Sequence, residues 1–469
     1  MTDASSALAT RTVPPGPPRR MTFGLLKKLF TDRLALMSTA AEYGDVVRIA
    51  IGPKTLYLVN HPDYAKHVLA DNSANYHKGI GLKEARRALG DGLLTSDGEL
   101  WRQQRKTVQP VFQNSRLSRQ AGIVASEVDS LVKRLRTHAG QGPVEILHEM
   151  TSLTLGVLGK TLLDAELGDH ESLGHSFEAV QDQAMFEAVT LGMVPKWLPL
   201  PKQLRFRESR DDLRRIANEL LALRKANPVE GGDDLLSALL SSAGGQADPA
   251  LGRQRIRDEL ITLLLAGHET TASTLGWAFQ LIDEHPEVAD LLRAEAIEVL
   301  GDRLPVAEDL HRLEYTAMVV AEVMRLYPPV WLLPRVAQND DDVGGFHIPA
   351  GADVVVVPYT LHRHRSFWAD PARFDPERFS PERAKSRPRY AYIPFGAGPR
   401  FCIGSGLGTM EAVFAVALVA RDLRLTKSPG HRVLPEAMLS LRVRGGLPMT
   451  VHPLDSRCAT EKTHPRAAA

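Results

Sequence analysis

The sequence predicts a mainly α-helical fold with a small β-rich subdomain, built as one large folding unit. Apolar residues recur at spacings of three and four through most of the chain, which is typical of amphipathic helices. Alternating apolar runs typical of strands occur near the N-terminus and again late in the chain. Because these strands lie so far apart in sequence, a division into independent domains is not expected.

The β-rich part is expected to begin with a hairpin. Two alternating runs, 46–51 and 56–59, flank Gly52 and Pro53, which favour a turn. A further β-rich run at 353–358 is closed by a proline. Helices are expected over 116–138, 145–165, 204–226, 233–242, 251–284, 286–300, 309–327 and 407–423.

The two ends of the chain are expected to lie outside the folded domain. Residues 1–20 form a Pro-rich leader and residues 453–469 a polar tail, and both lack hydrophobic periodicity. We therefore expect a disordered leader, a folded domain over 21–452 and a disordered tail.

The composition excludes several classes of protein. With 57 Lys and Arg against 56 Asp and Glu, the net charge of +1 gives no field that would attract nucleic acid. Two cysteines are too few for a disulfide framework or a four-cysteine zinc site, and a reducing cytoplasm fits them best. No apolar run near the N-terminus approaches the ~20 residues of a membrane span. A soluble protein without a membrane anchor is expected.

Residues 395–404 place one cysteine, Cys402, in a Gly-rich loop ahead of a helix. Gly398 and Gly404 permit positive φ and a close approach of the backbone to a large flat ligand. Amides at the start of the helix can lower the pKa of the thiol. This arrangement suits a thiolate held against a metal, and the alternative is a buried structural cysteine.

The loop resembles the haem-binding loop of the cytochrome P450 family, whose pattern is Phe-x-x-Gly-x-Arg-x-Cys-x-Gly. Phe395, Gly398, Arg400, Cys402 and Gly404 fill that pattern without departure. The resemblance implies haem b, iron protoporphyrin IX, as the cofactor, with the Cys402 thiolate as the iron ligand. It also implies that Arg400 meets a haem propionate and that Phe395 packs beside the sulfur.

A hexapeptide in the middle of the longest expected helix breaks local rules. Residues 266–271 include a glycine and two threonines, which are unfavourable inside a helix and suggest a functional role. The alternative is a tolerated kink in a buried helix. The segment resembles the oxygen-binding helix of the same family. The resemblance implies a catalytic acid–alcohol pair, Glu269 and Thr270, that relays protons. It places Ala266 against the haem and implies that Gly267 leaves room above it.

The same helix carries the beginning of a zinc-protease motif. His268 and Glu269 start the pattern His-Glu-x-x-His, but Ala272 stands where the second histidine is required, so zinc hydrolysis is rejected. His268 is expected to be solvated or packed against the helix rather than to bind iron.

Three further motifs agree with the resemblance. Glu322 and Arg325 form a Glu-x-x-Arg pair, which the family closes with an arginine that matches Arg378, and the role of all three is structural. Trp101 and Arg105 match a helix that binds a propionate, and Arg335 matches an arginine that reaches another. The alternatives are a surface ion pair and an amphipathic helix edge.

The segments expected to face the substrate are mainly apolar, which favours a lipophilic small molecule over an ionic one. A terpenoid is expected, and fatty-acid-like and polyketide substrates stay open. The residues expected at the substrate pocket are Leu93, Leu94, Met185, Phe186, Leu263, Ala266, Val330, Trp331, Leu332 and Leu441.

The resemblance implies a monooxygenase that inserts one atom of dioxygen into a C–H bond or a double bond. No flavin or iron–sulfur module fits after residue 452, so a separate ferredoxin with its reductase is expected to supply electrons to a monomeric protein. Six basic residues are candidates for the ferredoxin-docking face, with an ordinary solvated face as the alternative: Lys106, Arg116, Arg119, Lys385, Arg387 and Arg389. A non-catalytic haem-thiolate sensor, a fatty-acid hydroxylase and a peroxygenase are the rival functions.

Overall fold

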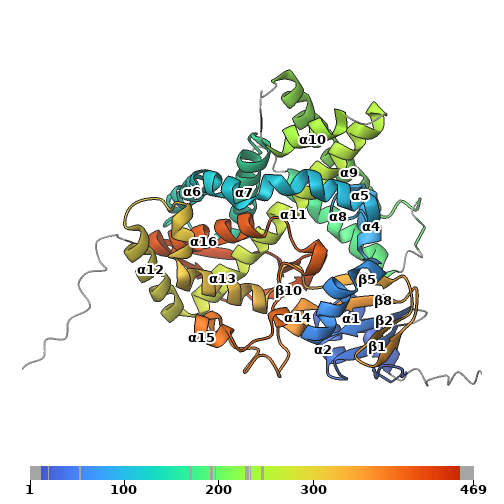
Figure 1. The fold of residues 1–469 in the computed structure, drawn as a ribbon. Coiled ribbons are helices and arrows are strands. Elements are labelled where there is room, and N and C mark those ends of the chain that lie inside the picture. Colours follow the sequence, from blue (N-terminus) through green and yellow to red (C-terminus); the bar gives the residue numbers. More distant parts are fainter. Residues whose placement is uncertain are drawn as a thin grey trace, which may run out of the picture.

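Helices make up most of the molecule, and a β sheet lies at one edge of it (Figure 1). The structure is a computed structural model that describes residues 12–18, 21–51, 54–167, 172–190, 194–195, 197–227, 232, 234–244 and 248–454. The predicted fold class, mainly α with a small β-rich subdomain, is confirmed.

The elements follow the chain in this order. The helices are α1 Thr22–Thr31, α2 Arg33–Ala41, α3 Pro62–Lys66, α4 Leu82–Leu89, α5 Gly98–Val108, α6 Asn114–Thr137, α7 Ile146–Leu158, α8 Ser172–Val189, α9 Pro201–Ala226, α10 Leu235–Gly244, α11 Pro249–Glu284, α12 Pro286–Leu300, α13 Glu314–Leu326, α14 Pro358–Leu361, α15 Pro381–Ala384 and α16 Ser405–Asp422. The strands are β1 Val46–Ile51, β2 Lys54–Val59, β3 Tyr76–Lys78, β4 Val144–Glu145, β5 Leu333–Ala337, β6 Asp341–Val343, β7 Phe346–Ile348, β8 Asp353–Val356, β9 Leu423–Lys427, β10 Leu434–Ala437, β11 Leu441–Arg444 and β12 Pro448–Pro453.

The helix α11 runs through the centre of the helical part, with α7 and α16 beside it (Figure 1). Asp248 caps its first turn by accepting a hydrogen bond from the amide of Ala250, and Pro249 occupies the first helical position. Its 36 residues span about 54 Å. Side chains such as Leu260, Leu264 and Trp277 are buried around its circumference, so α11 is the axis on which the other helices pack.

The largest sheet has the strand order β1-β2-β8-β5-β3. The predicted hairpin is confirmed as an antiparallel pair, and β8 joins β2 in parallel although it lies 300 residues later in the chain. Alternate side chains enter two different cores, as the period of a strand requires: Val46 and Val354 face one side, Val47 and Val355 the other. The strand β8 therefore joins the N-terminal and the later parts of the chain into one folded unit.

Two helix predictions need correction. The segment predicted over 145–165 ends as an α-helix at Leu158 and continues as a π-helical turn over Gly159–Leu163. The one predicted over 309–327 divides into a 3-10 turn at Ala307–His311 and α13. The helix α8 is not predicted at all, because its buried face carries polar side chains, among them Gln181 and Gln183, which hide the hydrophobic period.

The predicted leader is not wholly separate from the fold. In its described part, Pro15 accepts a hydrogen bond from the amide of Arg48 at 2.8 Å, and Thr12 accepts one from the amide of His347 at 3.0 Å. At the other end, Pro453 still belongs to β12, and the rest of the predicted tail after Leu454 lies outside the described residues. In the part of the chain that the structure describes, none of the helices is long and apolar enough to cross a membrane.

Candidate active site

A cavity of about 440 Å³ lies between the middle of α11 and the loop that precedes α16. Its wall collects residues from distant parts of the chain, including Met37 of α2, Met185 of α8, Thr270 of α11 and Leu407 of α16. Most of the exposed wall is apolar. Such a cavity suits a ligand that is largely hydrophobic.

The Gly-rich loop holds Cys402 at one wall of this cavity. The amide of Cys402 donates to the carbonyl of Phe395 at 2.9 Å and closes the loop. Gly398 has φ +67°, and a Cβ there would collide with the carbonyl oxygen of Leu69. The prediction of positive φ does not hold for Gly404, which precedes α16 with φ −87°; a Cβ there would make an ordinary contact with the ring of Phe112 at 3.8 Å.

The Cys402 thiol is exposed to the cavity although it lies deep in the protein. Desolvation by the surrounding protein raises its pKa, while the amide of Gly404 and the charge of Arg105 act in the opposite direction. Arg105 is fixed beside it by a hydrogen bond from Nη1 to the carbonyl of Phe401 at 2.8 Å. A thiol placed in this way is ready to become a metal ligand, since a bound cation favours the thiolate.

Three cations line the cavity close together: Lys78, Arg335 and Arg400, named here the cavity cations. Desolvation and the charge of Arg400 lower the pKa of Arg335 to about 10, and the same causes lower the pKa of Lys78. Among the described residues, Asp97 is the carboxylate that opposes them, and it pairs with Arg400. The Arg400 guanidinium also lies over the ring of Trp101, with 4.3 Å to its centroid. The cavity cations thus carry an excess of positive charge.

This donor set fits a haem. An apolar slot with a thiol in its wall and an excess of buried cations matches a flat hydrophobic group that carries a metal and two carboxylates. Lys78 belongs to this set but was not predicted, because it lies on the short strand β3, far in sequence from every motif.

The residues of α11 predicted for catalysis and haem contact also line the cavity. Thr270 donates from Oγ1 to the carbonyl of Ala266 at 2.8 Å, so its hydroxyl is held against the helix. Gly267 lines the same cavity, and a Cβ there would lie 2.6 Å from Leu158 of α7. Glycine at 267 therefore lets α7 approach α11 closely.

Glu269 lies on the cavity wall with its side chain 22% exposed. Ser440, in the turn between β10 and β11, donates a hydrogen bond from Oγ to Glu269 Oε1 at 2.7 Å. His268 was expected to be either solvated or packed, and it is packed. Its ring lies against Phe177, and its Nδ1 is 2.6 Å from the carbonyl of Leu264. Burial lowers the pKa of His268, so its neutral form is favoured.

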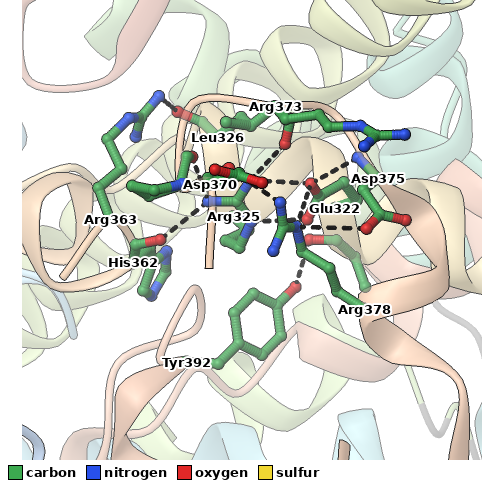
Figure 2. A network of polar contacts seen from close by, with 12 residues as sticks. Glu322, Arg325, Leu326, His362, Arg363, Asp370, Arg373, Asp375, Arg378 and Tyr392 are labelled. Carbon is green, nitrogen blue, oxygen red and sulfur yellow. Dashed lines mark hydrogen bonds and ion pairs between the residues drawn. The ribbon is translucent and has the colours of Figure 1, made fainter. Parts of the chain in front are cut away.

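The Glu-x-x-Arg pair and its expected third partner meet away from the cavity (Figure 2). Arg325 donates from Nε to Glu322 Oε2 at 2.6 Å and from Nη2 to Glu322 Oε1 at 2.8 Å. Arg378 Nε lies 3.4 Å from Glu322 Oε1. Arg325 also donates to the carbonyls of His362 and Pro371 at 3.0 and 2.8 Å. We call Glu322, Arg325 and Arg378 the buried triad; each is at most 4% exposed.

Eight of the residues predicted for the substrate pocket line the cavity, and two do not. Phe186 instead lies beneath the ammonium of Lys202, 5.9 Å from its ring centroid. Leu441 is fully buried in another core, and its carbonyl accepts a hydrogen bond from Ser273 at 2.5 Å. The eight that line the cavity are Leu93, Leu94, Met185, Leu263, Ala266, Val330, Trp331 and Leu332. Lining residues that were not predicted include Gln181, Thr274 and Glu411.

The six basic residues considered for partner docking divide into two groups. Arg116 is 8% exposed on α6, and Arg387 packs over the ring of Trp368 at 3.9 Å while it donates to the carbonyl of Arg378. These two do not present a free charge to a partner. The other four are exposed: Lys106, Arg119, Lys385 and Arg389.

Comparison with known proteins agrees with this geometry. The family model "Cytochrome P450" matches residues 14–447. The chain is 36% identical to cyclooctatin synthase of Streptomyces melanosporofaciens, with 87% of this chain and 89% of the relative covered. It is 34% identical to cyclooctat-9-en-7-ol 5-monooxygenase of the same organism, with 91% and 92% covered, and 32% identical to pentalenene oxygenase of Streptomyces avermitilis, with 87% and 90% covered. The chain therefore belongs to the cytochrome P450 family and is a haem-thiolate monooxygenase.

Proposed function

We propose that this monooxygenase oxidises a terpenoid, by hydroxylation or epoxidation, as a tailoring step in natural-product synthesis. The observation that carries this proposal is the apolar cavity beside Cys402, whose wall is formed by side chains such as Leu263, Val330 and Trp331. The relatives support it: the names pentalenene and cyclooctat-9-en-7-ol denote an unsaturated hydrocarbon and an unsaturated alcohol.

The cofactor in this proposal is haem b. Cys402 would bind its iron, and the cavity cations, with Arg105 and Trp101, would hold its two propionates. When bound, haem supplies the iron that activates dioxygen with electrons from a redox partner. Two carboxylates would balance the excess charge of the cavity cations, which is the physical reason for placing the propionates there.

Glu269 and Thr270 would handle the protons of the reaction. Glu269 contributes a carboxyl group to the part of the cavity wall that α11 forms. Thr270, the next residue of α11, contributes a hydroxyl to the same wall. A carboxyl group can take up a proton and pass it on, and a hydroxyl can donate a hydrogen bond into the cavity. The apolar residues around them keep bulk water away, which favours transfer to the substrate site over leakage.

Fatty acids fit the cavity less well than terpenoids. Their carboxylate needs a cation, and the cavity cations would be engaged by the haem. The remaining arginine of the wall, Arg33, already donates to the carbonyl of Ala437 at 2.7 Å, to the carbonyl of Leu29 at 3.3 Å and to the sulfur of Met438. A neutral polycyclic substrate makes no such demand.

Electrons would come from a ferredoxin with its reductase. The exposed basic residues Lys106 and Lys385 support an acidic partner. We further propose that the folded domain over 21–452 acts as a monomer in the cytoplasm.

The test is a spectroscopic titration of the purified holoprotein with pentalenene and, separately, with palmitic acid. A far-red-shifted Soret band of the reduced carbon monoxide complex establishes that the Cys402 thiolate is bound. We then expect a low-to-high-spin change with pentalenene at micromolar concentration and none with palmitic acid. A spin change with palmitic acid alone would contradict the terpenoid proposal and favour a fatty-acid hydroxylase.

A further inference from the structure

The carboxylate of Glu269 is held by a residue from another part of the fold. Ser440 lies 171 positions later in the chain, in the turn between β10 and β11, and its Oγ is 2.7 Å from Glu269 Oε1. Ser440 is 5% exposed and lines the same cavity as Glu269. The acid therefore has a fixed partner at one of its two oxygens.

Ser440 is itself oriented by Gln181 of α8. Its Oγ lies 3.2 Å from Gln181 Oε1, and its amide nitrogen lies 3.4 Å from the same oxygen. A hydroxyl has a single proton, and the nearer acceptor is Glu269. Gln181 Oε1 is thus the acceptor for the Ser440 amide, while the Ser440 hydroxyl proton is directed to Glu269. Gln181 is 1% exposed, so this chain of contacts is shielded from solvent.

The turn that carries Ser440 is anchored on both sides. Trp331 donates from its indole nitrogen to the carbonyl of Met438 at 2.8 Å. Ser273 of α11 donates from Oγ to the carbonyl of Leu441 at 2.5 Å. The position of the Ser440 hydroxyl relative to α11 is therefore set by the fold and not by a mobile side chain.

We propose that Ser440, oriented by Gln181, is a positioning residue that fixes the Glu269 carboxyl group for proton delivery into the cavity. This inference rests on the proposed role of Glu269 and deepens it. Without Ser440, the Glu269 side chain would distribute over several rotamers, and a displacement of about 1 Å is enough to slow an oriented reaction by orders of magnitude. The Ser440 hydroxyl binds Oε1, so the proton that Glu269 passes on is assigned to Oε2, which lies 3.9 Å from His268 Nε2.

The first measurement is structural and does not depend on activity. Crystal structures of the holoprotein and of its Ser440→Ala, Ser440→Thr and Ser176→Ala variants are compared. We expect one Glu269 conformer in the wild type and in Ser440→Thr, which keeps a hydroxyl, and a displaced or multiple conformer in Ser440→Ala. Ser176→Ala is the matched control, since it removes a buried serine hydroxyl that also donates to a carboxylate, Asp212 Oδ2 at 3.0 Å, and that neither holds the Ser440 turn nor lines the cavity. An unchanged Glu269 in Ser440→Ala would overturn the inference.

The second measurement follows the fate of dioxygen in the holoprotein without added substrate. Spinach ferredoxin, its reductase and NADPH supply the electrons. Dioxygen with two electrons and two protons gives hydrogen peroxide, and with four of each it gives two waters, so the peroxide formed per NADPH reports proton delivery. We expect Ser440→Ala and Gln181→Leu to shift this ratio in the direction of Glu269→Gln, by at least about twofold for Ser440→Ala. Ser440→Thr and Ser176→Ala should stay at the wild-type value.

The two proposals fail in different ways. A wild-type ratio in both Glu269→Gln and Thr270→Ala would contradict the proton relay itself, and with it the positioning role. A shifted ratio in Glu269→Gln together with a wild-type ratio in Ser440→Ala would leave the relay intact and overturn only the role of Ser440.

Discussion

The protein contains two clusters of buried cations that differ in charge balance. In the buried triad, Glu322 accepts two hydrogen bonds from Arg325, and Arg325 gives its remaining donors to backbone carbonyls (Figure 2). The cavity cations, Lys78, Arg335 and Arg400, are opposed by Asp97 among the described residues.

This difference in charge balance distinguishes a cluster of cations that belongs to the fold from one that binds a ligand. A buried cation whose donors are satisfied inside the chain is part of the fold, since nothing further is needed to offset its desolvation. Buried cations that outnumber the nearby carboxylates are poorly stabilised until an anion arrives. Substitutions in the two clusters should therefore change stability in different ways, with and without haem.

The largest effect is expected in the buried triad. Glu322→Gln leaves Arg325 buried, at 0% exposure, without its carboxylate, and removal of one partner of such a pair costs about 3–5 kcal/mol. We expect a large loss of stability in the apoprotein and the holoprotein alike, measured by urea unfolding.

Glu99→Gln is the matched control for this prediction. Glu99 and Arg102 form a pair with the same spacing as Glu322 and Arg325, but their side chains are 69% and 66% exposed. An exposed pair contributes about 0–1 kcal/mol. Equal losses in both variants would show that burial does not decide the strength of the pair.

A smaller effect that depends on the cofactor is expected at the cavity cations. Lys78→Met keeps the apolar stem but removes a charge that Arg335 and Arg400 disfavour. We expect the apoprotein to be at least as stable as the wild type, whereas haem should dissociate about tenfold faster, because one interaction with a propionate is lost.

Transfer of haem to apomyoglobin measures the dissociation rate, and thermal unfolding of the apoprotein measures its stability. Lys106→Met, at an exposed position of α5, should change neither. A destabilised apoprotein with normal haem retention would contradict the assignment of Lys78 to the cofactor site.

The smallest effect is expected from a buried carboxyl group on α16. Glu411 is 2% exposed, its Oε1 has no hydrogen-bond partner among the described residues, and burial raises its pKa from 4.5 to about 8. The Glu411 carboxyl group ionises at lower pH in the unfolded chain than in the folded protein. Its neutral form therefore contributes stability that is fully present below about pH 4.5 and is lost as the pH rises toward 8. Glu411→Gln removes this dependence.

We expect the melting temperature of Glu411→Gln, relative to wild type, to rise by about 2 °C or more between pH 5 and pH 8. Thermal unfolding of the two holoproteins at both pH values checks this expectation. Parallel pH profiles would show that Glu411 finds a partner that stabilises its charge.

Sequence patterns predicted those parts of the molecule that depend on short-range order. The helix α12 begins and ends where its period predicts, and β1 and β2 pair as predicted, while the turn residues Gly52 and Pro53 lie outside the described residues. The residues from Phe395 to Cys402 lie within one loop, so their spacing could be read from the sequence and carried the resemblance to a haem-binding loop. In these cases the deciding interactions join residues that are neighbours in the chain.

The tertiary structure decided what distant residues do together. Lys78 joins the cavity cations because β3 pairs with β5, which carries Arg335. Ser440 reaches Glu269 because the turn between β10 and β11 is anchored to α11. The helix α8 was missed because its inner face holds Gln181, whose partner is this same turn. A sequence pattern records the period of apolar residues, whereas a polar contact between distant segments has no period and exists only after the core has formed.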